Sequence, residues 1–208
     1  MRLILHHLVN SRSQRILWLL EELSASYDIR TYQRDSITNL APPELAQVHP
    51  LGKSPLLEAD GRLIGESGAI VEYLCEQCSG DWLIPDRKDD HYIDYLEFLH
   101  FAEGSAMTPI LLNLYASRLA DAAAPIMPRI AEQLDAHFQY MDKTLAATGH
   151  FAGADWTAAD VMMSFPAEIA VMNGAENYPH LVQFVKQCHA RPAWKRARQR
   201  GGPYFMFQ

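Results

Sequence analysis

The residues whose types could bind a ligand lie in two short segments, Lys53-Ser54-Pro55 and Glu66-Ser67. Pro55 cannot donate to a sheet ladder, so the backbone beside it stays free where an apolar strand-like run begins. X-Pro bonds are the usual place for a cis peptide, which here would turn the Ser54 amide and carbonyl outward as a docking edge for an extended peptide. Ser67 precedes a helical pattern, so its hydroxyl and backbone N–H form a ready anion site. Together the two segments suit a small peptide with an anionic end.

A third group of polar residues, Asn10 and Ser11, lies where a strand-like run passes into a helical pattern. Ser11 can cap that helix, because a serine oxygen accepts a hydrogen bond from a first-turn amide. Its hydroxyl can also point at a ligand held beside Ser54 and Ser67. The sequence by itself leaves both interpretations open.

These three groups belong to a pattern of strands and helices in the order β-α-β-(α)-β-β-α. The predicted strands are residues 3–8, 30–34, 56–59 and 62–64, with helical patterns over residues 16–23 and 69–74 and an irregular connection over 36–48. Asp60-Gly61 is a hairpin signal between the last two strands. We therefore expect a thioredoxin-like α/β domain over residues 1–80.

The remainder of the chain is predicted to be helical. Residues 81–90 are polar and contain Pro85, as a linker would, and residues 91–208 carry apolar side chains at spacings of three and four. Thr157 and Asp160 form a capping-box signature before one of these helices. The apolar C-terminus, from Pro203 to Phe207, is expected to fold back over the bundle or over a pocket mouth. The second domain is predicted to be an all-α bundle.

The composition is that of an ordinary water-soluble globular protein, with 49% apolar and 21% charged residues. A net charge of -7 argues against nucleic acid and against a membrane surface as partners, since both favour a basic protein face. Neither a signal peptide nor a membrane-spanning run of roughly eighteen apolar residues is evident. Three cysteines are too few for a disulfide framework, which fits a reducing compartment. We expect a cytoplasmic protein with a small ligand and no metal.

Two motifs closely resemble the soluble, cytosolic glutathione S-transferase family. Pro50-Leu51-Gly52-Lys53-Ser54-Pro55 and Glu66-Ser67-Gly68-Ala69-Ile70 are specific as a pair, and Asn10-Ser11-Arg12-Ser13 is similar to the serine-type, bacterial or fungal members. The resemblance covers the whole chain. It implies a detoxifying transferase that takes glutathione as co-substrate, acts on a small hydrophobic electrophile and forms a homodimer.

The resemblance also implies roles for individual residues. Ser11 would donate a hydrogen bond to the glutathione sulfur, with Asn10 as the second candidate and His7 as the third. The remaining assignments are Lys53, Ser54, Pro55, Glu66 and Ser67 for binding glutathione, and Met107, Leu111 and Tyr115 for the electrophile pocket. Apolar residues at the spacing of the last three can equally form plain core.

Two other functions fit the same sequence. One is a binding or regulatory module that keeps the scaffold without catalysis, although the retained glutathione-binding residues favour an enzyme. The other is a glutathione-dependent peroxidase, which would start from the same glutathione thiolate, or an oxidoreductase that uses Cys75 and Cys78, which have the spacing of a redox pair. These cysteines lie late in a helical pattern rather than at a helix N-terminus, so ordinary packing is the stronger interpretation.

Overall fold

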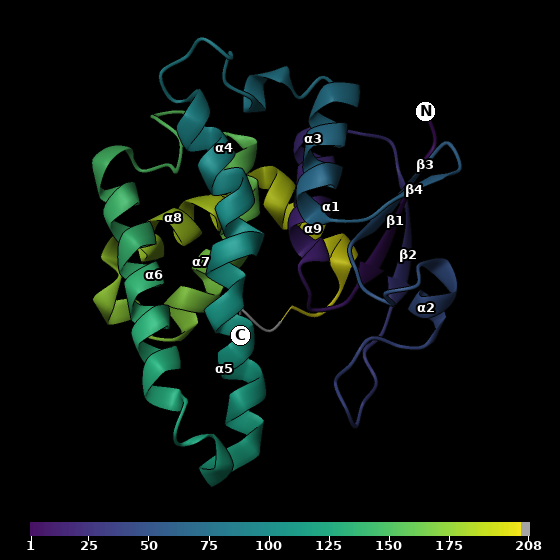
Figure 1. Cartoon of the computed structure of the whole chain (residues 1–208). Helices are drawn as coiled ribbons and strands as arrows, with labels where there is room; N and C mark the ends of the chain where they lie inside the picture. The colour runs from purple at the N-terminus through teal and green to yellow at the C-terminus, as the bar shows by residue number, and fades with distance from the viewer. Residues whose placement is uncertain (205–208) are drawn as a thin grey trace. The chain divides into compact units, whose positions relative to one another are not determined.

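A computed structural model describes residues 1–204 of the chain, which form two compact units. Residues 1–83 and the described residues from His189 onward make up the first unit, and Ile84–Cys188 make up the second (Figure 1). The sequence-based division assigned everything after residue 90 to the helical domain, whereas the structure groups the end of the chain with the first unit. Phe205, Met206 and Phe207, which were expected to fold back, lie outside the described residues.

The first unit contains a four-stranded mixed sheet in the order β2-β1-β3-β4. Its strands are β1 (Leu3–Leu8), β2 (Asp28–Tyr32), β3 (Leu56–Ala59) and β4 (Arg62–Ile64). Strand β1 pairs with β2 in parallel and with β3 antiparallel, and β3 pairs antiparallel with β4. The predicted hairpin turn is present, with positive φ angles of 47° at Asp60 and 86° at Gly61.

The first unit also contains four helices: α1 (Ser13–Glu22), α2 (Glu44–Val48), α3 (Ser67–Gln77) and α9 (Pro192–Gly201). Figure 1 shows α1, α3 and α9 on one face of the sheet and α2 on the other. Helix α1 is buried on all sides, because α3 and α9 cover what the sheet leaves open. On the opposite face, Leu45 of α2 packs against Leu8 and Leu56. The thioredoxin-like prediction is confirmed for the sheet and its helices.

Ion pairs and hydrogen bonds connect α9 to the C-terminal end of α1. The Arg191 guanidinium binds the Glu22 carboxylate, and Arg196 Nε donates to Glu21 Oε2 at 2.8 Å. Arg200 adds a second cation to Glu21 at 3.0 Å. Helix α9 is therefore a structural part of the first unit, joined to it by residues about 170 positions apart in the chain.

The second unit is a helical bundle, as predicted. It consists of α4 (Tyr92–Phe101), α5 (Met107–Ala116), α6 (Met127–Thr148), α7 (Ala158–Met172) and α8 (Pro179–Ala190, its last two residues beyond the unit). Helices α4 and α5 are continuous through a π-helical turn, Ala102–Ala106. Helix α7 is the central element, since nearly all its residues are buried, and α4, α5 and α6 pack against it.

The capping box at the start of α7 is confirmed. The Thr157 side chain accepts from the third helical amide, and Thr157 N–H donates to Asp160 Oδ2 at 2.8 Å. Asp160 Oδ1 also accepts from the Phe151 amide at 2.9 Å. Burial raises the pKa of Asp160 above its usual value. This box therefore connects the loop before α7 to the core of the bundle.

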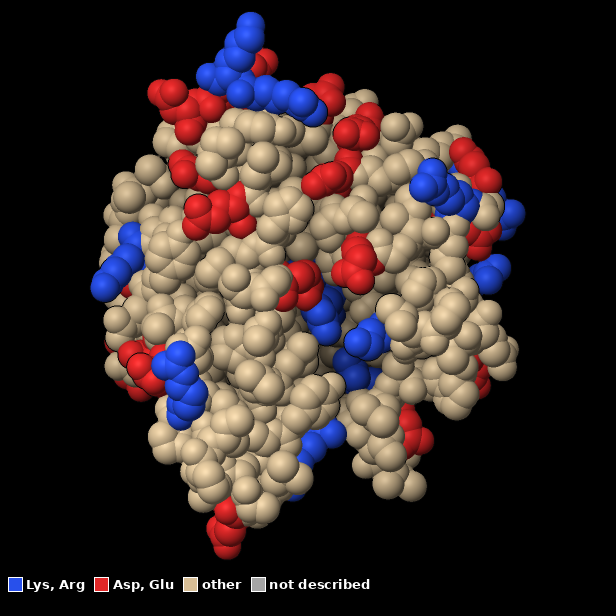
Figure 2. Space-filling model, in the orientation of Figure 1, with Lys and Arg blue, Asp and Glu red and all other residues tan. Residues whose placement is uncertain are grey.

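Among residues 1–204, no helix combines the length and the apolar character that crossing a membrane requires. On the face drawn in Figure 2, carboxylate and basic side chains are interspersed. That face therefore lacks the continuous basic surface that attracts polyanions.

Candidate functional site

Ser11 and Ser54 meet at the same residue of β1, although 43 positions separate them. Ser11 Oγ donates to the Leu8 carbonyl at 2.8 Å, and Leu8 N–H donates to Ser54 Oγ at 3.1 Å. Ser54 Oγ also donates to the His6 carbonyl at 2.8 Å. The Ser54-Pro55 bond is cis, as predicted. The end of β1 thus brings the catalytic candidate next to the predicted docking edge.

The Ser11 hydroxyl is buried at the start of α1 and forms further bonds there. Its oxygen accepts from Ser13 N–H at 3.2 Å and lies 3.1 Å from Ser13 Oγ. Ser11 is 6% exposed, so only a small part of it reaches the surface. Both interpretations of Ser11 are compatible with this geometry, since it holds the first turn of the helix and lies beside the docking edge.

The His7 side chain points toward α1 and α9. Its Nε2 lies 2.9 Å from the Gly201 carbonyl, and its Nδ1 lies 2.6 Å from Ser13 Oγ. A carbonyl can only accept, so Nε2 carries the proton and Nδ1 accepts from Ser13. Burial lowers the pKa of His7 to about 4. His7 is therefore a neutral, packed side chain that reaches Ser11 only through Ser13.

Asn10 adopts a left-handed conformation, with φ of 54°. The Arg34 guanidinium holds this turn: its Nε donates to the Val9 carbonyl at 3.1 Å and its Nη2 to the Asn10 carbonyl at 2.9 Å. The third donor, Nη1, binds the Asn39 carbonyl at 2.8 Å. Arg34 thus fixes the backbone that enters Ser11.

Glu66 and Ser67 form the start of α3. Glu66 is exposed and has a φ of 63°, a conformation that a non-glycine residue rarely adopts outside functional or tightly held turns. Ser67 is buried, and its oxygen accepts from Arg15 Nη2 at 2.9 Å. Arg15 belongs to α1, so the predicted anion site is attached to the same helix that follows Ser11. Lys53 is exposed in the loop before β3.

Sequence reasoning missed Arg15, Ser13 and Arg34. Each supports a predicted residue through a hydrogen bond. Ser13 was noted only as part of the Asn10–Ser13 motif, and Arg15 and Arg34 belong to none of the motifs described above. Arg15 gave one usable signal, because it is a charged residue within the apolar run of α1 and is 2% exposed. A buried cation in such a position requires a polar partner.

The three residues assigned to the electrophile pocket follow one stripe of α5 with different exposure. Met107 is 2% exposed and belongs to the core of the bundle, Leu111 is half-buried, and Tyr115 is 56% exposed. Arg118 lies 5.9 Å from the centre of the Tyr115 ring. Of the three, Leu111 and Tyr115 therefore present surface to a ligand.

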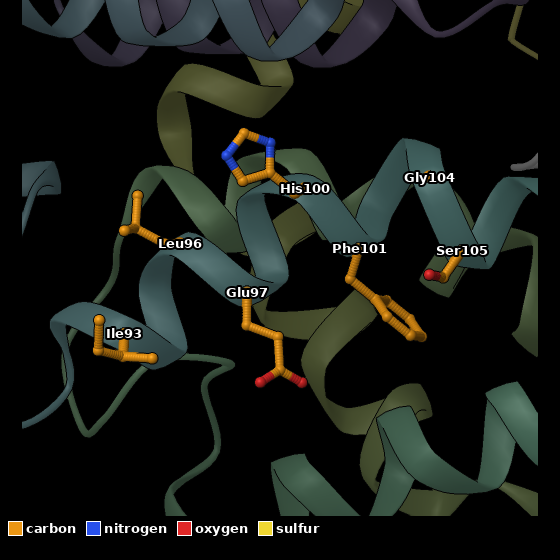
Figure 3. A pocket seen from close by; sticks show the side chains of 7 residues that line it. All are labelled: Ile93, Leu96, Glu97, His100, Phe101, Gly104 and Ser105. Carbon is orange, nitrogen blue, oxygen red and sulfur yellow. The ribbon is translucent and has the colours of Figure 1, made fainter.

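A separate hollow of about 590 Å³ lies along α4 and the π-helical turn. It is lined by Ile93, Leu96, Glu97, His100, Phe101, Gly104 and Ser105 (Figure 3). In this view His100 points to the side opposite Glu97 and Phe101. The Tyr140 hydroxyl donates to the Glu97 carboxylate, and the Phe101 ring stacks on His137. Because these side chains point in different directions, they do not enclose a binding site. The hollow is an open surface along α4 and the π-helical turn.

Cys75 and Cys78 are free thiols on α3 and at its end. Cys75 is fully buried, and burial raises the pKa of its thiol to about 12, while the Cys78 pKa is also raised. A redox cysteine needs the opposite shift, toward the thiolate. This environment supports the packing interpretation over a redox pair.

Comparisons with known proteins agree on one family. Residues 1–76 match the family model for the glutathione S-transferase N-terminal domain, and residues 105–197 match the one for the C-terminal domain. Glutathione S-transferase 3 of Schizosaccharomyces pombe is 33% identical, over 95% of this chain and 87% of its own. Glutathione S-transferase 1 of Saccharomyces cerevisiae is 26% identical, over 94% and 93%. A solved glutathione S-transferase from Actinobacillus pleuropneumoniae is 30% identical with a TM-score of 0.88, over 97% of this chain and 94% of that one. The chain belongs to the glutathione S-transferase family.

Proposed function

We propose that this protein is a glutathione transferase that activates the glutathione thiol at Ser11 for attack on a small hydrophobic electrophile. The observation that carries the proposal is the shared anchoring of Ser11 and Ser54 on Leu8, at distances of 2.8 and 3.1 Å. It brings a hydroxyl donor beside an edge suited to an extended peptide.

The chemical task is to ionise a thiol near neutral pH. A free thiol has a pKa of about 8.5, and each unit by which the pKa falls corresponds to about 1.4 kcal/mol. When the Ser11 hydroxyl turns from the Leu8 carbonyl to the sulfur, its oxygen keeps the bond from Ser13 N–H, 3.2 Å away. Accepting that bond strengthens the hydroxyl as a donor, and the start of α1 adds positive potential. Asn10 remains the alternative donor.

The charged groups of glutathione need different partners at the two ends of the peptide. Its γ-glutamyl carboxylate suits Ser67 at the start of α3, and its ammonium suits the exposed Glu66 carboxylate. Lys53 is placed before the docking edge, where an ammonium can meet the other carboxylate. Proximity then supplies much of the rate, since the sulfur and electrophile are oriented together. Leu111 and Tyr115 are the proposed walls for the electrophile.

The proposal extends to assembly and location. Ile93 is 67% exposed on α4, beside half-buried Leu96 and Phe101. An exposed apolar surface of this kind supports a homodimer. A cytoplasmic location and a detoxifying role complete the proposal.

The test is a pH titration of glutathione binding, followed by the ultraviolet absorbance of the thiolate. We expect thiolate well below pH 8.5 with the native protein, and its loss with Ser11→Ala. Ser36→Ala, at an exposed serine, is the matched control. Loss with Asn10→Ala instead would transfer the donor role to Asn10. Binding without thiolate would identify a non-catalytic binding module.

Docking is tested separately by calorimetry. Ser67→Ala removes a hydrogen bond to a charged group, worth about 1.5–3 kcal/mol, and should weaken glutathione binding roughly tenfold or more. Unchanged affinity would show that the γ-glutamyl end binds elsewhere.

A further inference from the structure

Arg34 makes three hydrogen bonds to main-chain carbonyls and thereby joins two loops. Its donors reach Val9 at 3.1 Å, Asn10 at 2.9 Å and Asn39 at 2.8 Å. The side chain is half-buried, and burial lowers the pKa of its guanidinium. A guanidinium remains charged under such conditions, and its planar fork suits several acceptors at once.

The first two carbonyls belong to the peptide units that lead into Ser11. In a trans peptide the N–H points opposite to the C=O, and Ser54-Pro55 is the cis bond found among the described residues. The N–H groups of Asn10 and Ser11 therefore point away from Arg34. A charge-assisted bond at each carbonyl also polarises the N–H of the same peptide unit. Arg34 thus sets the direction and the polarity of the backbone next to the catalytic candidates.

Arg34 supports the left-handed conformation of Asn10. A φ of 54° is uncommon for a residue other than glycine, although asparagine tolerates it. If the turn relaxed to a right-handed or extended conformation, the peptide before Ser11 would rotate and the hydroxyl would move with it. The bonds from Arg34 to both sides of Asn10 oppose that rotation.

We propose that Arg34 is a positioning residue for thiolate formation, which acts by fixing the peptide units on either side of Asn10. This inference rests on the proposed glutathione transferase function. It assigns Arg34 no contact with the substrate. Its effect should appear in the ionisation and turnover of bound glutathione more than in the affinity for glutathione.

The experiment compares the native protein with Arg34→Gln and Arg34→Lys, each saturated with glutathione. The readouts are the pKa of the bound thiol from thiolate absorbance, together with kcat and the KM for glutathione. We expect both variants to raise the thiol pKa by about one unit and to lower kcat about tenfold, with a smaller change in KM. Lysine keeps the positive charge, but its ammonium cannot reproduce the planar arrangement by which the guanidinium binds three carbonyls. If Arg34→Gln does not fold, Arg34→Lys carries the test.

Arg30→Gln is the matched control, because Arg30 is an exposed arginine on the strand before Arg34. It should leave the thiol pKa and kcat at their native values. A native thiol pKa in the Arg34 variants would overturn the inference, and so would a loss of stability alone. If the thiol pKa were native in Arg34→Lys but raised in Arg34→Gln, the positive charge of Arg34 would explain the effect, and the positioning inference would be overturned. If the native protein itself forms no thiolate, the proposed function fails rather than this inference.

Discussion

His7 donates its Nε2 proton to the main-chain carbonyl of Gly201, 2.9 Å away, and so connects the first strand to the end of α9. The bond fixes the tautomer of His7, because a carbonyl cannot donate. Nδ1 is then obliged to accept from Ser13, the first residue of α1. One carbonyl near the end of the chain thereby determines the hydrogen bonds around the start of the helix that follows Ser11.

This arrangement predicts a pH dependence of stability. The pKa of His7 falls from 6.5 to about 4 on folding, so the unfolded chain binds more protons between these pH values. The free energy of unfolding should therefore decrease as pH falls from 6.5 to 4, by about 3 kcal/mol from this group. Urea unfolding of the native protein and His7→Gln over this range measures the difference, since glutamine does not titrate.

The control for that measurement is His100→Gln, at an exposed histidine. It should leave the pH dependence unchanged. If His7→Gln lost stability on acidification as steeply as the native protein, His7 would not be the group responsible.

Gly201 gives a second prediction, on packing. A Cβ at this position would lie 2.8 Å from Gln14 Oε1, 2.9 Å from Leu17 Cδ2 and 3.2 Å from His7 Nε2. All three side chains are buried, so none can move away freely. We expect Gly201→Ala to lower the free energy of unfolding by about 1–3 kcal/mol, as overpacking does. Thermal unfolding provides the measurement.

Gly104→Ala is its counterpart, because open space surrounds a Cβ there. It lies in the π-helical turn, where alanine should be neutral or stabilising by up to about 1 kcal/mol. Equal effects of the two substitutions would contradict the proposed contact of α9 with α1.

The sequence predicted features that depend on neighbouring residues, but it did not predict contacts between residues far apart in the chain. Asp60-Gly61, the Ser54-Pro55 bond and the capping box depend on a few neighbouring residues, and each was predicted. The place of α9 depends on the contact of Gly201 with residues nearly 200 positions earlier, which no periodicity encodes. The same holds within the site, where Ser11 and Ser67 were found from motifs but Arg34 was not. Its partners are carbonyls, which every residue possesses.

The cysteines provide a test of the redox alternative. With a thiol pKa of about 12, Cys75 is almost entirely protonated at pH 8 and should resist a thiol reagent in the folded protein. Cys78 is half-buried and should react slowly. Cys75→Ala and Cys78→Ala should both retain transferase turnover. Labelling in urea, where all cysteines become reactive, shows that the reagent is adequate.

Rapid labelling of Cys75 in the folded state would contradict its burial. Loss of turnover in the two cysteine variants, with glutathione binding intact, would instead restore the oxidoreductase interpretation.

If the protein is a homodimer, one substitution in its interface should convert the dimer to a monomer. Ile93→Glu places a charge on the exposed apolar surface of α4, and burying that charge in an interface is strongly unfavourable. Light scattering should give a dimer for the native protein and a monomer for the variant. Leu112→Glu, at an apolar side chain of α5 that is 48% exposed, should stay dimeric. A native monomer at working concentration would refute the dimer.

The capping box makes the last prediction, on the stability of the second unit. Thr157→Ala removes the side-chain oxygen that accepts from the third helical amide, and it also removes the 3.1 Å bond to Asp160. The loss of a cap should lower the free energy of unfolding by about 1 kcal/mol. Thr144→Ala, near the C-terminal end of α6, removes only a bond to the carbonyl one turn earlier and should be nearly neutral. Because Asp160 is fully buried and keeps its bonds from the Phe151 and Thr157 amides, the variant should fold and bind glutathione normally. Unchanged thermal stability of Thr157→Ala would mean that Asp160 alone holds the start of α7.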